Sequence, residues 1–146
     1  MTLSARAGLT VIAVAALAAG VLAHLGAGRT SATFDEIVLV SGGLRGIEEQ
    51  RWDMVTDQPP LMMYSYGLAA RSASPVRPAE DRAWLFDDRW DYARDLFFRQ
   101  GNDPTELLAR ARVVASVLAT VLVAAAGAYA WWIAGPLAAG AAALFT

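Results

Sequence analysis

The chain has 146 residues, of which 56% are hydrophobic and 18% are charged, with no cysteine and a formal net charge of −2. This composition excludes a disordered chain, a disulfide-stapled secreted domain, and a nucleic-acid binder, which normally carries a positive excess. All 14 acidic residues and 11 of the 12 arginines lie between positions 29 and 112, whereas both flanks are almost entirely apolar. That separation is typical of a membrane protein.

Each flank contains an uncharged run long enough to cross a bilayer. Residues 7–25 are 19 uncharged residues and residues 113–132 are 20, which is about 29 Å and 30 Å of helix. The second run ends in aromatic residues of the kind found at the headgroup boundary. A signal peptide is the alternative for the first run. Its apolar core exceeds the usual length of about 7–15 residues, which favours an uncleaved anchor.

A third apolar stretch, residues 137–146, follows the break at Gly135-Pro136. As a helix it covers only about 15 Å. A helix that ended half-way through lipid would leave carbonyl groups without partners. We therefore expect this stretch to start a third membrane helix, and the chain to be the N-terminal part of a longer polytopic protein. The predicted fold class is all-α integral membrane, with two complete transmembrane helices, the start of a third, and a long helical loop over residues 26–112.

The charge distribution also predicts an orientation. Arg6 and the amino terminus favour a cytoplasmic position for residues 1–6. With two spans, the loop 26–112 is then extracytoplasmic, which its length allows. The exclusive use of arginine over lysine, together with abundant alanine and glycine, suggests a bacterial protein of the plasma (inner) membrane.

Inside the loop, a helix is predicted to begin at Thr33, because Thr33 and Glu36 have the spacing of a capping box. Apolar residues then recur at intervals of three and four along one side: Ile37, Val40, Leu44 and Ile47. The same spacing predicts that three polar residues lie away from this side: Ser41, Arg45 and Glu48. Such an amphipathic helix suits a membrane surface or packing against other helices.

The segment Asp57-Gln58-Pro59-Pro60-Leu61 is predicted to break this helix, because paired prolines remove backbone donors and disfavour α geometry before them. Residues 61–70 are then predicted to form a second short helix. Aromatic residues follow at 84–86 and 90–98, where interfacial anchors or a small core are the default interpretation.

The end of the loop carries stop and start signals. Gly101 is the expected C-cap of the aromatic segment. Asp103 supplies an N-cap and Pro104 a first helical position. The helix that begins there is expected to run unbroken into residues 113–132.

Two acidic residues stand just beyond the first membrane segment, Asp35 and Glu36. As first-turn carboxylates they complement the helix dipole, and Glu36 closes the capping box. Alternatively, one of them is a general base whose pKa is raised by partial burial at the membrane face. Arg110 and Arg112 allow two interpretations as well, interfacial snorkelling or a clamp on a lipid phosphate. The sequence shows no metal-ligand cluster and no other cofactor motif.

Taken in order, three short elements resemble those of polyprenyl-phosphate-sugar-dependent glycosyltransferases, the superfamily of the protein O-mannosyltransferases and the lipid A aminoarabinose transferase. These elements are Phe34-Asp35-Glu36, Asp57-Gln58-Pro59-Pro60-Leu61 and Ala111-Arg112-Val113. In that family an acidic pair follows the first span, a PEHPPL-like element and a Trp-containing stretch come next, and an arginine stands at the start of the second span. The resemblance covers residue 33 onward and corresponds to the opening part of a much longer enzyme.

The resemblance implies a polyprenyl-phosphate-linked sugar donor and chemistry at the outer membrane face. Asp35 would act as the base on an acceptor hydroxyl, with inversion at the anomeric carbon, and Glu36 would support it. Arg112 would steady the donor phosphate or the loop. Gln58 stands where the family usually has histidine; glutamine does not titrate but still hydrogen-bonds. The sugar, the carrier lipid, the acceptor and any metal requirement stay open.

The predicted function is thus the N-terminal part of an integral-membrane glycosyltransferase, inactive as this piece because its site would be built from several loops. The expected partners are the lipid bilayer and the lipid-linked sugar donor, and no nucleic acid. Two alternatives stay open. One is a non-catalytic membrane anchor or interaction protein, in which Asp35 and Glu36 only cap a helix. The other is a subunit completed by a partner that supplies further helices.

Overall fold

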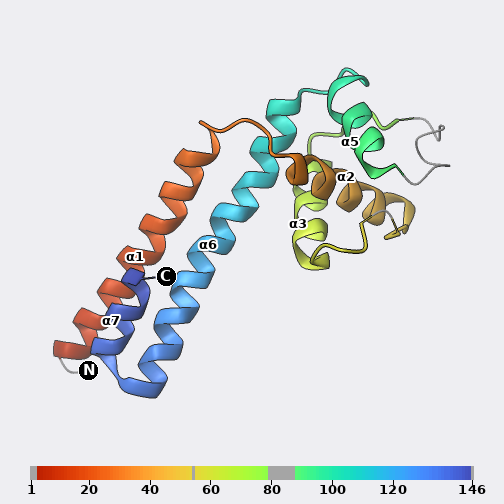
Figure 1. Ribbon diagram of the computed structural model, residues 1–146. Coiled ribbons are helices and arrows are strands. Elements are labelled where there is room, and N and C mark those ends of the chain that lie inside the picture. The colour runs from red at the N-terminus through yellow and green to blue at the C-terminus, as the bar shows by residue number, and fades with distance from the viewer. Residues whose placement is uncertain (1–2, 54, 79–87, 146) are drawn as a thin grey trace. The chain divides into compact units, whose positions relative to one another are not determined.

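The computed structural model describes residues 3–53, 55–78 and 88–145. Within these ranges all regular structure is helical (Figure 1): α1 (Leu3–Ala27), α2 (Phe34–Glu49), α3 (Pro60–Arg71), α5 (Arg89–Phe98), α6 (Pro104–Ala134) and α7 (Pro136–Phe145). The chain divides into two compact units. The first comprises Met1–Arg29 with Ala115–Thr146, and the second comprises Thr30–Val114.

The first unit consists of α1, the C-terminal part of α6, and α7. Both α1 and α6 are long and apolar enough to cross a bilayer, and the predicted segments 7–25 and 113–132 lie inside them. α7 is a shorter apolar helix that packs along α1 (Figure 1). The residues that are buried together here are few and mostly small: Ile12, Ala16, Val123, Ala139 and Ala143.

Many of the larger apolar side chains of α1 and α6 are exposed. Leu17 is 65% exposed and Leu122 is 62% exposed. An apolar surface of this extent is unusual on a protein surrounded by water and is ordinary on helices surrounded by lipid. Gly135, with a φ of +85°, ends α6, and Pro136 begins α7, as the sequence predicts.

α2 is the central helix of the second unit and packs against α3 and α5. Its predicted start is confirmed. The Thr33 hydroxyl accepts from the Glu36 amide at 3.4 Å, and the Glu36 carboxylate accepts from the Thr33 amide at 2.9 Å. The apolar residues expected on its inner side are buried at Ile37, Val40 and Leu44.

The expectation that Ser41 and Arg45 lie away from the buried side is wrong, since they are 0% and 2% exposed. α2 is covered on more than one side, and its glycines let neighbouring segments approach its backbone. Both polar side chains make hydrogen bonds within α2. Ser41 Oγ donates to the Ile37 carbonyl at 2.7 Å, and Arg45 Nε donates to the Glu49 carboxylate at 3.0 Å.

α2 and α3 cross where two glycines meet. A Cβ placed on Gly43 would overlap the backbone of Met63 and Gly67, and one placed on Gly67 would overlap the backbone of Gly43 and Leu44. Absence of side chains at both positions therefore sets the close approach of the two helices.

Two predicted boundaries within the second unit are wrong. α2 ends at Glu49, before the predicted break at Asp57, because Gln50 takes the left-handed conformation (φ 57°, ψ 31°) and caps the helix. α5 ends at Phe98 with Arg99 as its C-cap, so Gly101, with a φ of +80°, lies beyond the cap.

The other boundaries follow the sequence closely. α3 covers Pro60–Arg71 against the predicted 61–70. α6 begins at Pro104, where the Asp103 carboxylate accepts from the Thr105 amide at 2.8 Å, and it continues without a break to Ala134. The aromatic residues predicted at 84–86 lie outside the described residues.

Candidate functional site

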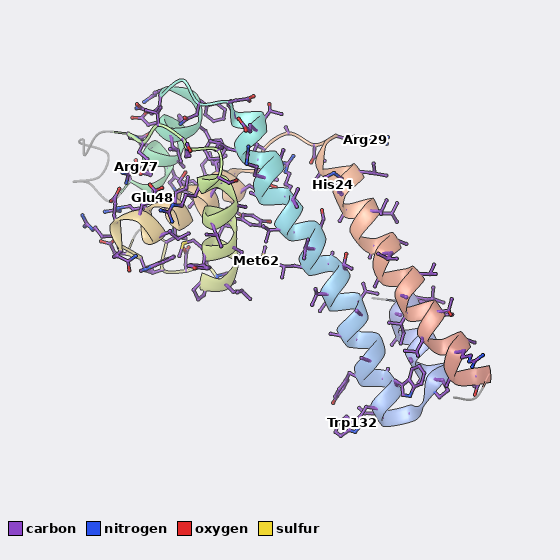
Figure 2. The ribbon with its side chains drawn as sticks, turned by 180° about the vertical axis from the view of Figure 1, so that it is seen from behind. His24, Arg29, Glu48, Met62, Arg77 and Trp132 are labelled. Carbon is purple, nitrogen blue, oxygen red and sulfur yellow. The ribbon has the colours of Figure 1, made fainter. Side chains whose placement is uncertain are left out.

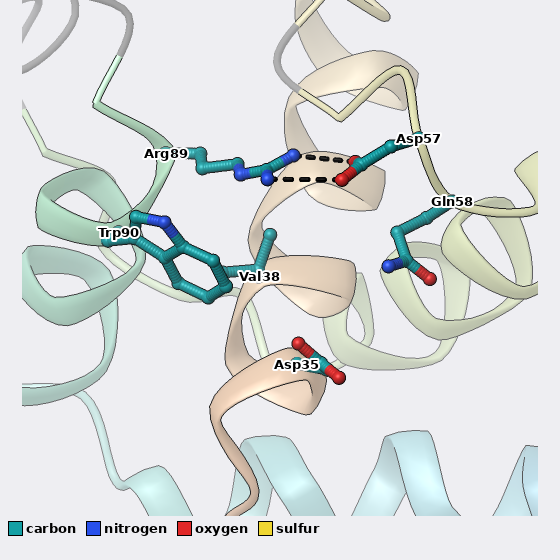
Figure 3. A pocket seen from close by; sticks show the side chains of 6 residues that line it. All are labelled: Asp35, Val38, Asp57, Gln58, Arg89 and Trp90. Atoms are coloured by element: carbon teal, nitrogen blue, oxygen red, sulfur yellow. Dashed lines mark hydrogen bonds and ion pairs between the residues drawn. The ribbon is translucent and has the colours of Figure 1, made fainter.

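The second unit contains a small pocket where three segments meet: the start of α2, the residues just before α3, and the start of α5 (Figure 3). Its volume is about 60 Å³, and it is lined by Asp35, Val38, Asp57, Gln58, Arg89 and Trp90. A pocket of this size holds a hydroxyl group or a few water molecules, whereas sites that enclose a whole small-molecule ligand measure roughly 300–1,000 Å³. Any larger ligand would place only one of its groups here.

Asp35 lies in the first turn of α2, and its side chain is exposed at the pocket. The capping of α2 is complete without it, because Thr33 and Glu36 make both hydrogen bonds of the capping box. Among the residues that the structure describes, no hydrogen bond or ion pair to the Asp35 carboxylate is found. Asp35 is therefore an acceptor available for a ligand hydroxyl.

Gln58 is half-buried and lines the same pocket, so the structure brings together two of the residues that the sequence singles out. It precedes Pro59 and Pro60, and Pro60 begins α3. Proline at the first helical position fixes the chain direction there. The Gln58 amide offers both a donor and an acceptor beside Asp35 without changing its charge with pH.

Asp57 and Arg89 form an ion pair at the pocket with two hydrogen bonds (Figure 3). The distances are 2.5 Å from Arg89 Nη1 to Asp57 Oδ1 and 3.1 Å from Nη2 to Oδ2. These hydrogen bonds from Arg89 hold the pKa of Asp57 below its ordinary value. The pair ties the segment before α3 to the start of α5, and so fixes two walls of the pocket.

Trp90 continues this connection to α2. The Arg89 guanidinium lies 5.2 Å from the centre of the Trp90 ring, and the Trp90 ring stacks on Phe34 with centroids 3.9 Å apart. Because Phe34 directly precedes Asp35, the stack holds the first turn of α2 against α5. Trp90 thus has a packing role in the pocket wall.

Glu36 and Arg112, the other two predicted site residues, are paired with each other and are not among the residues that line the pocket. Arg112 Nε donates to Glu36 Oε1 at 2.8 Å, and Nη2 donates to Oε2 at 2.7 Å. The same guanidinium donates to the carbonyl groups of Thr30 and Ser31, each at 2.9 Å. This geometry gives Arg112 a structural role in closing the second unit.

For Glu36, burial raises the pKa as expected, but the net shift of the pKa is downward. Hydrogen bonds from the Arg112 guanidinium outweigh desolvation and hold the pKa of Glu36 below its ordinary value. A carboxylate that is already bonded to an arginine and to the Thr33 amide is a poor proton acceptor. The two acidic residues therefore differ in role: Glu36 is part of a structural ion pair, and the Asp35 carboxylate is available to a ligand.

Sequence reasoning did not identify Arg89 as a site residue or Asp57 as its partner. The two residues are 32 positions apart, and a pair across that distance leaves no periodic signal. Among the residues that the structure describes, no group of three or more His, Cys, Asp or Glu side chains is placed to hold a metal ion.

Comparisons of the chain with protein families, with curated proteins and with solved structures find no match. The site is therefore interpreted from its own geometry.

Proposed function

We propose that this chain carries the acceptor-activating pocket of an integral-membrane glycosyltransferase that uses a polyprenyl-phosphate-linked sugar donor. The observation that supports the proposal is that the Asp35 carboxylate is available to a ligand at the pocket. Its carboxylate faces a pocket beside the Gln58 amide, while Thr33 and Glu36 cap the helix. The order of the three short sequence elements, and the two helices long enough to cross a bilayer, support the same class.

In this proposal α1 and α6 span the plasma membrane of a bacterium, and the second unit lies on the outer side. A lipid-linked donor then lies in the bilayer next to the unit. The acceptor is an extracytoplasmic hydroxyl compound that reaches the pocket from the aqueous side.

The proposed reaction assigns a role to each group of the pocket. The Asp35 carboxylate takes the proton of the acceptor hydroxyl, and the acceptor oxygen forms a bond to the anomeric carbon. The bond from that carbon to the phosphate oxygen breaks, and the polyprenyl phosphate leaves with the electron pair. Gln58 orients the hydroxyl, and the Asp57–Arg89 pair keeps the pocket walls in place.

The test compares Asp35→Asn with Asp91→Asn in the protein as its gene encodes it, assayed in membranes with radiolabelled undecaprenyl-phosphate hexoses and pentoses. Asparagine keeps the size of the side chain but cannot accept the proton. We expect label transfer to fall roughly 10²–10⁴-fold in Asp35→Asn, the usual contribution of a general base. Asp91 is an exposed acid on α5 paired only locally with Arg94, so its variant should transfer at the normal rate.

Protein amounts in the membrane are measured for both variants, so that a loss of folding is not mistaken for a loss of chemistry. Unchanged transfer by Asp35→Asn would remove Asp35 from the mechanism and leave it as a first-turn acid that complements the helix dipole. That result would favour the non-catalytic anchor or interaction protein.

A further inference from the structure

α3 presents an apolar face that no described part of the second unit covers. Its inner side, with Met63, Tyr66, Gly67 and Ala70, is buried, and Gly67 meets α2. On the opposite side Leu61 is 67% exposed, Tyr64 48% and Leu68 49%, while Trp52 is 37% exposed with its ring 6.0 Å from that of Tyr64. These four residues are called the α3 outer face below.

Charge is distributed unevenly between the exposed helices of this unit. α3 contains a single charged residue, Arg71 at its C-terminal end, which is 57% exposed and lies 3.6 Å from the Glu48 carboxylate of α2. α5, although shorter, contains four: Arg89, Asp91, Arg94 and Asp95. A short helix that is apolar on both sides is expected to be covered on both sides, because exposed leucine and tyrosine in this density are unfavourable in water.

Both ends of the second unit are joined to the two apolar helices, which brings the unit close to any bilayer that those helices cross. Only six residues separate Ala27, the end of α1, from Phe34, the start of α2, a reach of about 20 Å even when extended. At the other end, Arg112 lies one residue before the uncharged run of α6 and holds the carbonyl groups of Thr30 and Ser31. The chain therefore enters the second unit at Thr30 and leaves it after Arg112 at points that are hydrogen-bonded to each other.

We infer that the α3 outer face docks into the boundary between the headgroups and the acyl chains of the bilayer. Leu61 and Leu68 enter the apolar layer, and Tyr64 and Trp52 lie at the headgroup level, where tyrosine and tryptophan are enriched. Arg71, at the C-terminal end of α3, contacts lipid phosphates. In Figure 2, α3 is the helix that carries the labelled Met62. A bilayer is favoured over a soluble protein partner because the tethered unit meets its surface at a high and constant effective concentration.

The inference depends on membrane insertion of α1 and α6 and is independent of glycosyl transfer. The absence of cysteine allows single cysteines to report on single positions. Leu61→Cys and Leu68→Cys are labelled with the fluorophore NBD in the full chain, reconstituted into vesicles of phosphatidylcholine and phosphatidylglycerol. Arg94→Cys, exposed on α5, is the control that should stay in water, and Val121→Cys, exposed on α6, is the control for insertion.

Replacing phosphatidylcholine with its dibrominated form quenches a label that contacts acyl chains, and iodide quenches a label in water. We expect brominated lipid to reduce the emission at positions 61 and 68 at least twofold, with a blue-shifted spectrum, and to leave position 94 unchanged. Quenching at 61 and 68 by iodide alone would show that α3 faces water and would overturn the inference.

Two other outcomes also overturn it. Protection of positions 61 and 68 from both quenchers would show that protein covers the α3 outer face, either a second copy or another polypeptide. Loss of bromolipid quenching at position 121 would show that α6 is not inserted, and would then count against the proposed function as well. Bromolipid quenching at all of 61, 68 and 121 combined with a failed sugar-transfer assay would keep the docking surface and reject the enzyme.

Discussion

Arg112 donates to four oxygen atoms of its own unit: both carboxylate oxygens of Glu36 and the carbonyl oxygens of Thr30 and Ser31. Its side chain is only 10% exposed and that of Glu36 only 19%. Removing one partner of such a buried pair leaves the other charge without compensation, and this is more costly than losing the attraction itself.

We predict that Arg112→Ala destabilises α2 by about 2 kcal/mol, which is less than the roughly 3–5 kcal/mol for a fully buried pair because the site is not fully enclosed. Hydrogen exchange of residues 34–49 in lipid nanodiscs, measured by mass spectrometry, should accelerate roughly thirtyfold. Arg110→Ala is the matched control, since Arg110 lies two positions away and makes exposed contacts with Glu106 and Ser72. It should cost about 0.5 kcal/mol or less. Unchanged exchange in Arg112→Ala would instead leave its guanidinium available for a donor phosphate.

The Glu36–Arg112 pair also gives the unit a pH dependence of known sign. Because the pKa of Glu36 is lower in the folded chain than the unfolded value of about 4.3, the pair contributes its full stability above that value. The contribution is lost as the pH falls through the lowered pKa.

We therefore predict that the difference in α2 opening free energy between the natural chain and Glu36→Gln is constant from about pH 7 to pH 5 and shrinks below the ordinary glutamate pKa. Hydrogen exchange between pH 7 and pH 3, corrected for the intrinsic exchange rate, measures that difference. Other acids titrate equally in both proteins and cancel. A difference that grew on acidification would show that the pKa of Glu36 is raised.

The Asp57–Arg89 pair yields a prediction that does not depend on enzyme activity. Without the guanidinium, Asp57 loses the hydrogen bonds that lower its pKa. Carbon-13 NMR titration of the Asp57 carboxyl group should show a higher pKa in Arg89→Ala than in the natural chain. Arg94→Ala, which removes the partner of Asp91, should leave the pKa of Asp57 where it was. An unchanged pKa of Asp57 in Arg89→Ala would mean that a group other than Arg89 lowers it.

At the scale of single helices, local signals were sufficient where the structure depends on local contacts. The capping box at Thr33, the N-cap at Asp103 and Pro104 at the first helical position each act within a few residues, and each is found as predicted. The burial of Ser41 and Arg45 depends on which helices come to lie against α2. Periodicity describes one face of a helix and does not report a second covered face.

The glycines of α2 allow neighbouring segments to pack on a second side of the helix. They differ in which atoms an added Cβ would contact. A Cβ at Gly43 would overlap the backbone of α3. A Cβ at Gly42 would meet side-chain atoms and no backbone, with Val55 Cγ2 at 2.8 Å and Met63 Sδ at 3.0 Å.

We predict that Gly43→Ala destabilises the α2–α3 pair by about 3 kcal/mol through overpacking. Gly42→Ala is the neighbouring control; its strain is offset by the better helix propensity of alanine, about 1 kcal/mol, so the net change should be small. Hydrogen exchange of residues 60–71 measures the change in stability in both variants. Equal, small effects at the two positions would show that the helices are not in backbone contact at Gly43.

At the scale of the whole molecule, the division of charge along the sequence corresponds to the division into units. The apolar flanks lie in the first unit and all the acidic residues belong to the second. Composition and run length were sufficient for that division, because the preference for lipid or water is nearly additive over residues. The pocket was predicted only in part. Asp35 and Gln58 belong to recognisable short elements, whereas Arg89 reaches Asp57 only through the packing of α5 on α2.

The orientation of the whole molecule is the condition on which the lipid-linked sugar chemistry rests, and it can be measured directly. Two single-cysteine variants of the cysteine-free chain report the two sides: Ser74→Cys in the exposed turn after α3, and Ser4→Cys at the start of α1. In intact cells a membrane-impermeant maleimide should label Ser74→Cys and should label Ser4→Cys only after lysis, because Arg6 favours a cytoplasmic start. The opposite pattern would place the acidic unit in the cytosol, where an extracytoplasmic acceptor cannot reach Asp35.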